Sequence, residues 1–144
     1  MIRLLTIQDA CAIQQINRES LGYDFSLAET TKKLERLLAD TTHHILLGYE
    51  EQETIVGYVH AEIYDTLYFE TLLNILALAV GGNQRRRGVG RKLMLALEVE
   101  AKNRGIQTIR LNSGSTRIEA HTFYGSLGYG DVKLQKRLLK KLSE

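Results

Sequence analysis

Five basic residues and four glycines fall together in one short stretch. It reads Val80-Gly-Gly-Asn-Gln-Arg-Arg-Arg-Gly-Val-Gly90-Arg-Lys-Leu, and its basic residues are Arg85, Arg86, Arg87, Arg91 and Lys92. An apolar run precedes it and an amphipathic run follows it, which predicts the start of a helix. Backbone N–H groups there lack intrahelical acceptors, and the helix dipole adds positive charge. Gly88 and Gly90 carry no Cβ to hold an anion away. An arginine run alone would fit a solvated helix face, but with the glycines it favours a diphosphate site.

Two common phosphate-binding loops do not fit this stretch. A nucleotide-hydrolase loop needs a Ser or Thr after its Gly-Lys pair to hold magnesium, and Gly90-Arg-Lys-Leu lacks that hydroxyl. A dinucleotide fold needs Gly-x-Gly-x-x-Gly early in the chain, but here the third position is Leu93 and the motif comes late. Both interpretations are therefore set aside on particular residues.

The elements that would position this loop form a mixed α/β domain. Thr6, Ser26 and Thr116 each begin a capping-box spacing that predicts a helix start. The 72–80 run is almost continuously apolar and suits a central buried strand, with a helix left open. The predicted order begins with a strand over 2–5, two helices, and strands over 44–49, 54–64 and 72–80. A helix over 89–101, ended by Gly105, a strand over 107–111 and a helix broken at Gly128 follow. The last segment, 132–142, fits a helix or a strand. An antiparallel meander thus precedes a β-α-β unit.

Composition narrows the class of protein. With 144 residues, 44% apolar and 25% charged, the chain is predicted to be one domain over 1–144. It shows no leader and no apolar run near the ~18 residues that cross a bilayer, so we expect no membrane partner. The single cysteine, Cys11, is interpreted as a packing residue of a cytoplasmic protein. A net charge of +2 is too small to indicate nucleic acid, and its local concentration favours a small anionic ligand.

Two motifs in order resemble those of the GNAT (Gcn5-related N-acetyltransferase) family. Arg85-Arg-Arg-Gly88-Val-Gly90 meets the acetyl-CoA signature Arg/Gln-x-x-Gly-x-Gly/Ala. One strand and one helix later, Ala120-His-Thr-Phe-Tyr124-Gly-Ser-Leu-Gly-Tyr129 meets Ala-x-x-Phe-Tyr-x-x-x-Gly-Phe/Tyr. The order of the earlier elements is also similar, so the resemblance covers nearly the whole chain. It implies a GNAT fold of the α/β (α+β) class, with a central mixed sheet of about six to seven strands flanked by about four helices.

The resemblance also implies a reaction, the direct transfer of an acetyl group from acetyl-CoA to an amine. It assigns the pyrophosphate to backbone amides of about 85–91, which includes Val89, with the arginines assisting. It assigns polarisation of the thioester oxygen to a backbone amide near the end of the central strand, at Leu78, Ala79 or Val80. The family's tyrosine, which protonates the departing thiolate, corresponds to Tyr124. Arg117 stands where many relatives have an asparagine that helps to hold CoA, so that contact uses a guanidinium or is missing.

The residue that takes the proton from the acceptor amine is left open. Many relatives have a glutamate on the central strand one residue before an isoleucine, but here that residue is Asn74, which cannot act as a base. Glu70 is ranked first as a substitute, ahead of Glu62, His60 and Asp65. No pair of histidines shows metal-ligand spacing with a carboxylate, so no metal is expected.

The resemblance places the acceptor pocket among 21–25, 64–70 and the residues after Tyr129. Its aromatic and acidic side chains would suit a cationic amine, and the acceptor is expected to be a small molecule or a peptide. Polyamines, aminoglycosides, amino acids, protein lysines and N-termini all stay open. One alternative is a non-catalytic acyl-CoA-binding or sensing domain, supported by Asn74. The other is a nucleic-acid binder built on two basic stretches, 85–92 and 133–141. Relatives often form homodimers, so a homodimer is one option here.

Overall fold

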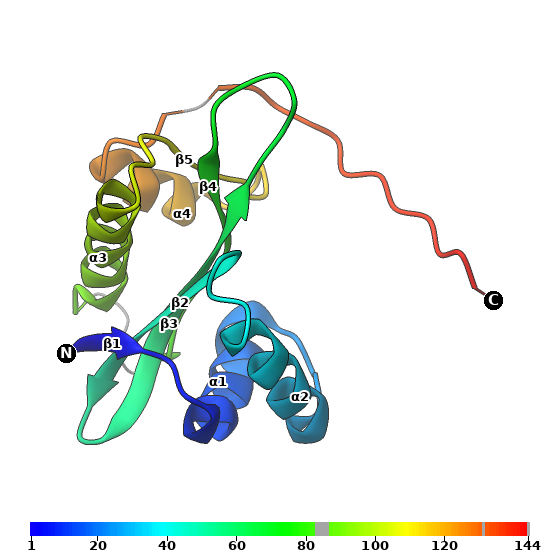
Figure 1. Cartoon of the computed structure of the whole chain (residues 1–144). Coiled ribbons are helices and arrows are strands. Elements are labelled where there is room, and N and C mark those ends of the chain that lie inside the picture. The colour runs from blue at the N-terminus through cyan, green and yellow to red at the C-terminus, as the bar shows by residue number, and fades with distance from the viewer. Residues whose placement is uncertain (83–86, 131, 144) are drawn as a thin grey trace. The chain divides into compact units, whose positions relative to one another are not determined.

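The structure is a computed structural model that describes residues 1–82, 87–130 and 132–143. The chain divides into two compact units, Met1–Leu111 and Asn112–Glu144, and each is described by itself. The first unit holds the sheet and most of the helices, and the second holds one helix and the C-terminal segment (Figure 1).

The first unit is built on a single five-stranded sheet in the order β1-β2-β3-β4-β5. Its strands are β1 (Ile2–Leu4), β2 (His44–Glu51), β3 (Thr54–Tyr64), β4 (Leu72–Val80) and β5 (Ile109–Leu111). The first four are antiparallel, and β5 runs parallel to β4. The predicted strands are thus confirmed, and the apolar 72–80 run is a strand rather than a helix. Five strands are fewer than the six to seven expected, because the described residues 132–143 form no strand.

Helices cover both faces of this sheet. The described residues form four α-helices, as expected: α1 (Ala10–Ile16), α2 (Leu27–Leu38), α3 (Val89–Asn103) and, in the second unit, α4 (Ile118–Ser126). The short turns η1 (Ile7–Asp9) and η2 (Asn17–Leu21) flank α1. In Figure 1, α1 and α2 lie on one face of the sheet and α3 on the other. The fully buried side chains include Val59 and Leu73 of the sheet and Leu93, Met94 and Leu97 of α3, which anchor α3 to its face.

Two of the three predicted helix starts are confirmed. Ser26 Oγ accepts the N–H of Glu29 at 3.1 Å at the start of α2, and Asp9 accepts the N–H of Thr6 at 2.7 Å before α1. The third, at Thr116, is wrong. The N–H of Ile118 donates to the carbonyl of Thr116 at 3.0 Å in a tight turn, so α4 begins later, with Arg117 at its N-cap.

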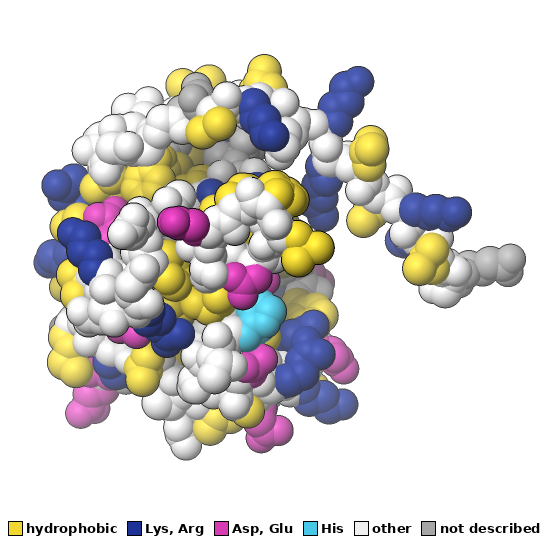
Figure 2. All heavy atoms as spheres, turned by 45° about the horizontal axis from the view of Figure 1, so that its top comes forward, with side chains coloured by type: hydrophobic (Ala, Val, Ile, Leu, Met, Phe, Trp, Pro, Cys, Tyr) yellow, Lys and Arg dark blue, Asp and Glu magenta, His cyan; other side chains and the backbone are white. Residues whose placement is uncertain are grey.

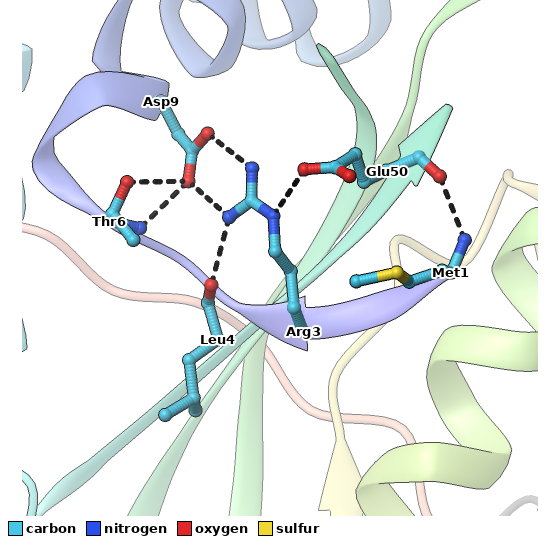
Figure 3. A network of polar contacts seen from close by, with 6 residues as sticks. All are labelled: Met1, Arg3, Leu4, Thr6, Asp9 and Glu50. Atoms are coloured by element: carbon cyan, nitrogen blue, oxygen red, sulfur yellow. Dashed lines mark hydrogen bonds and ion pairs between the residues drawn. The ribbon is translucent and has the colours of Figure 1, made fainter. Parts of the chain in front are cut away.

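A partly buried ion-pair network joins the N-terminal strand to the rest of the first unit (Figure 3). The Arg3 guanidinium donates to both carboxylate oxygens of Asp9, at 2.9 and 2.8 Å, and to Glu50 at 2.6 Å. Only 8% of the Asp9 side chain is exposed. Burial raises the pKa of Asp9, but the hydrogen bonds from Arg3 and Thr6 outweigh it, and the pKa ends below its usual value.

We expect Asp9→Asn to lower the free energy of unfolding by about 1–2 kcal/mol at pH 7, because the variant leaves the partly buried Arg3 with a weaker partner. A lowered folded-state pKa stabilises the protein above the unfolded-state pKa of about 4. That stability is lost as pH falls through the folded value. Urea unfolding from pH 7 down to about pH 2 should therefore show a constant gap between wild type and variant above about pH 4, and a gap that closes below it. Asp24→Asn removes an exposed carboxylate 3.7 Å from Arg18; an equal loss in that control would contradict the prediction.

Candidate active site

The central strand β4 changes character halfway along its length. The residues paired with β3 jump from Ile75 to Ala77, so Leu76 is an extra residue in a β-bulge. Pairing with β5 covers only Leu73 to Ile75. In the described part of the chain, the 76–80 half of β4 therefore has no strand on its β5 side. This side of the strand is not used for strand pairing, and the predicted Leu78, Ala79 and Val80 all lie on this open half.

The end of the open half is tied to the first helices. Ser20 Oγ, in the π-helical turn η2, donates to the carbonyl of Val80 at 2.6 Å. The neighbouring Asn17 accepts the Tyr58 hydroxyl at 2.5 Å. These bonds fix η2 against the sheet beside β4, which the sequence did not predict, because a π turn has no clear residue signature.

The glycine loop leads into α3 as predicted. Gly88 is the N-cap of α3 with φ +82°, a left-handed conformation, and it has no side chain to cap the first amides. A Cβ on Gly88 would meet no atom of the described residues within 4 Å. Arg87 pairs with Glu51 at 3.1 Å, and Val89 is buried while Arg91 is exposed. Arg85 and Arg86 lie outside the described residues.

A glycine on β3 brings the start of α3 close to the end of β4. A Cβ on Gly57 would come within 3.1 Å of Val89 Cγ1 and 3.2 Å of the Ala79 carbonyl oxygen. The absence of that atom lets the helix approach the open half of β4. The start of α3, where backbone amides can accept an anion, thus packs beside the Ala79 end of β4.

A polar row crosses the sheet just before the bulge. Glu62 of β3 lies directly opposite His44 of β2 and Asn74 of β4. Asn74 Nδ2 donates to Glu62 Oε2 at 2.9 Å, and His43 Nε2 lies 3.2 Å from Glu62 Oε1. Asn74 Oδ1 is buried and has no hydrogen-bond partner in the described structure. The sequence offered Glu62 and Asn74 separately, and only the strand register brings them together.

His60 lies next to this row and stays neutral. Its Nε2 is 2.9 Å from His44 Nδ1. Burial and the nearby His44 lower the pKa of His60 to about 4, and burial followed by His43 lowers the pKa of His44. At neutral pH both rings are therefore neutral, and the N–H of one imidazole donates a hydrogen bond to the bare nitrogen of the other.

The other two candidate bases lie in the 65–71 connection. Glu70 and Asp65 line a hollow of about 670 Å³ with Thr71 and Arg104. Asp65 also lines a second hollow of about 450 Å³, which contains Glu62. Acidic side chains gather beside a histidine on the face shown in Figure 2. Tyr23 and Tyr68 of the expected acceptor loops are exposed.

One trio of possible metal ligands was not predicted. Ligand atoms of Asp40, His43 and His44 lie within 4.8 Å of one another. The sequence pattern hid this trio because a turn, rather than helical or strand spacing, brings Asp40 to the histidines. His43 and His44 already contact Glu62 and His60.

In the second unit, Tyr124 lies on α4 and is largely buried. Burial raises its pKa, against the opposing charge of Arg117, so the phenol keeps its proton at neutral pH. The N–H groups of Gly128 and Tyr129 donate to Gly125 and Tyr124, both at 3.0 Å. This Schellman end, with Gly128 at φ +95°, sets the Tyr129 ring 6.1 Å from that of Tyr124.

Comparison with known proteins gives a consistent result. Residues 10–129 match the acetyltransferase (GNAT) family. An aminoglycoside 6'-N-acetyltransferase from Acinetobacter haemolyticus is similar, with TM-score 0.83, 17% identity and 99% of each chain covered. A transcriptional regulator from Bacillus halodurans gives TM-score 0.88 and 19% identity, over 97% of this chain and 99% of its own. Glucosamine-6-phosphate N-acetyltransferase from Arabidopsis thaliana gives TM-score 0.80 and 19% identity, over 99% of this chain and 98% of its own.

No curated protein matches the chain in sequence, and the solved structures, all at low identity, establish the fold. Among the described residues, no helix is both long and apolar enough to cross a membrane. The family match extends over most of both units and includes the glycine loop and the Tyr124 motif. This chain therefore belongs to the acetyltransferase (GNAT) family, and it is an acyltransferase.

Proposed function

We propose that this protein transfers the acetyl group of acetyl-CoA directly to a primary amine. The observation that carries the proposal is the open half of β4 beside the uncapped start of α3. A free strand edge offers backbone donors to a thioester and its pantetheine chain, and a helix start offers donors to a diphosphate. No other described element combines these two features.

The chain's own groups divide the work as follows. The amides that follow Gly88, with the arginines of 85–91, hold the pyrophosphate. A backbone amide at Leu78, Ala79 or Val80 polarises the thioester carbonyl as negative charge develops on its oxygen. Arg117 adds a cationic contact to the cofactor, and Tyr124 donates a proton to the departing thiolate. Glu70 and Glu62 are the competing candidates for the proton of the amine.

The acceptor is proposed to be a cationic amine, because Asp65, Glu70 and Glu62 line the two hollows beside the sheet. Two similar structures are named as aminoglycoside acetyltransferases and one as a glucosamine-6-phosphate N-acetyltransferase. Those names support amino sugars as the first compounds to test, followed by polyamines and lysine peptides. We also propose a single domain over 1–144, a cytoplasmic location and a homodimer, with no nucleic acid or membrane partner.

The second candidate function is a non-catalytic acyl-CoA sensor, favoured by Asn74 at the position where relatives have a glutamate. Calorimetric titration with acetyl-CoA, with ATP and NAD as controls, tests the donor. We expect saturable one-site binding of acetyl-CoA alone, followed by CoA release when amino sugars, polyamines and lysine peptides are added. Binding without CoA release from any amine would support the sensor, and no binding would overturn the proposal.

A further inference from the structure

Glu62 lies beside Asn74, the position where many relatives have a glutamate. The register pairs Glu62 on β3 with Asn74 on β4, so a carboxylate and an amide lie side by side at the point where many relatives have a glutamate on β4. By the alternation of β3, Glu62 lies on the same face as Tyr58, which packs in the core with α1. The side chain of Glu62 is 24% exposed, so a ligand can reach it.

The hydrogen bonds around Glu62 hold its carboxylate in place, and each carboxylate oxygen can still accept a further hydrogen bond. Asn74 Nδ2 donates to Oε2, and His43 Nε2 contacts Oε1. Because the Asn74 amide group faces Glu62 through its nitrogen, its oxygen is turned away and has no partner among the described residues. An ammonium group has three N–H donors and no acceptor. The partly exposed carboxylate oxygens of Glu62 can accept from such a donor, while Asn74 only holds that carboxylate in place.

The position along β4 separates Glu62 from Glu70. The Glu62–Asn74 pair precedes Leu76, where the open half of β4 begins, by about 7 Å of strand. Glu70 lies in the 65–71 connection, two residues ahead of β4, and so further from Leu76 along the chain than Asn74, which pairs with Glu62. A base must come within hydrogen-bond reach of the amine, directly or through one water. Glu62 satisfies this for an amine at the open half far better than Glu70.

The surroundings keep Glu62 ionised. Burial raises its pKa, but the hydrogen bonds from Asn74 and His43 outweigh burial and leave the pKa below its usual value. The ionisable groups nearest to it are His43 and His44 at β2 and His60 on β3, with Asp40 and Asp65 lining the same hollow.

Building on the proposed function, we infer that Glu62 accepts the proton of the acceptor's ammonium group and that Asn74 positions its carboxylate. The proton passes from nitrogen to a Glu62 oxygen, and the freed lone pair forms the N–C bond to the thioester carbon. The C–S bond breaks, and the thiolate takes a proton from Tyr124. The amine nitrogen loses its second proton to solvent, and solvent returns a proton to the Tyr124 phenolate. Glu62 then releases its proton to water. The sum is ammonium plus acetyl-CoA giving amide, CoA and one proton.

The test compares Glu62→Gln with wild type, using sisomicin, spermidine and a lysine peptide as acceptors. At pH 7 we expect kcat to fall roughly 100-fold, with the calorimetric Kd for acetyl-CoA unchanged. The deficit should shrink as pH rises past the pKa of the acceptor amine, because the amine then arrives without the extra proton. A merely structural role would not produce this recovery. Glu53→Gln, at the exposed tip of the β2–β3 hairpin, is the matched control and should keep wild-type rates.

A paired exchange guards against misfolding as the cause. Glu62→Gln combined with Asn74→Glu moves the carboxylate to β4 and keeps one amide and one carboxylate in the row, and it should recover at least tenfold of the lost rate. Wild-type rates in Glu62→Gln, or a larger loss in Glu70→Gln, would overturn the assignment while the acetyltransferase function stands. Acetyl-CoA binding without turnover on any of these amines in wild type would instead overturn the catalytic proposal itself.

Discussion

Replacing Tyr124 with phenylalanine should lower kcat by roughly 100-fold or more, since a positioned general acid contributes about 10²- to 10⁴-fold. The variant removes one hydroxyl from a largely buried side chain and leaves its ring packing against Phe123 and Tyr129. A departing thiolate has a pKa near 8.5, and without a proton donor it is a poorer leaving group. Steady-state assays of CoA release should show a large fall in kcat, while the acetyl-CoA affinity changes little.

Tyr129→Phe is the matched control for this prediction. It removes a hydroxyl from the neighbouring ring, at a position where the family motif accepts either phenylalanine or tyrosine. We expect Tyr129→Phe to keep its rate within about threefold, a change of under 1 kcal/mol in the barrier. If both variants, or neither, lost activity, Tyr124 would have no specific role as the acid.

The pH dependence of kcat in the wild type provides a second test of Tyr124 as the acid. Burial raises the pKa of Tyr124, so the phenol stays protonated well above neutral pH. Loss of the acid form therefore should not limit kcat below about pH 10.

The sequence predicted most of the elements because local signals and tertiary structure agree. The apolar 72–80 run, the Ser26 cap and the glycines at the ends of α3 and α4 each act within a few residues, and each is confirmed. Thr116 shows where local reasoning fails. Its capping-box spacing is present, but a tight turn at Gly114 and Thr116 uses the backbone groups first, and spacing alone does not reveal that competition.

The candidate site was predicted less completely, because its arrangement depends on register. Glu62 and Asn74 are 12 positions apart in sequence and meet only because β3 and β4 pair in one register. Shifting that pairing by one residue would turn one of them to the other face. The bulge at Leu76 and the short overlap with β5 likewise come from strand pairing. Residue types in an apolar run carry no sign of them.

Gly88→Val should weaken acetyl-CoA binding by roughly 100-fold, or about 3 kcal/mol, the worth of one or two hydrogen bonds to a charged group. Gly88 adopts φ +82° at the start of α3, and a Cβ there meets no atom of the described residues within 4 Å. A branched side chain would fill the open space in front of the first amides, where the diphosphate is proposed to bind. It would also strain a left-handed residue by about 1–2 kcal/mol.

Gly105→Val separates the two effects. Gly105 ends the same helix with φ +74°, and a Cβ on it likewise meets nothing within 4 Å. Both variants should therefore lose similar amounts of stability in urea unfolding, because the strain is the same. Only Gly88→Val should lose acetyl-CoA affinity by calorimetry, because Gly105 lies at the opposite end of α3. Equal losses of affinity would mean that strain in the helix, rather than access to its first amides, controls binding, and the diphosphate would then have to be placed elsewhere.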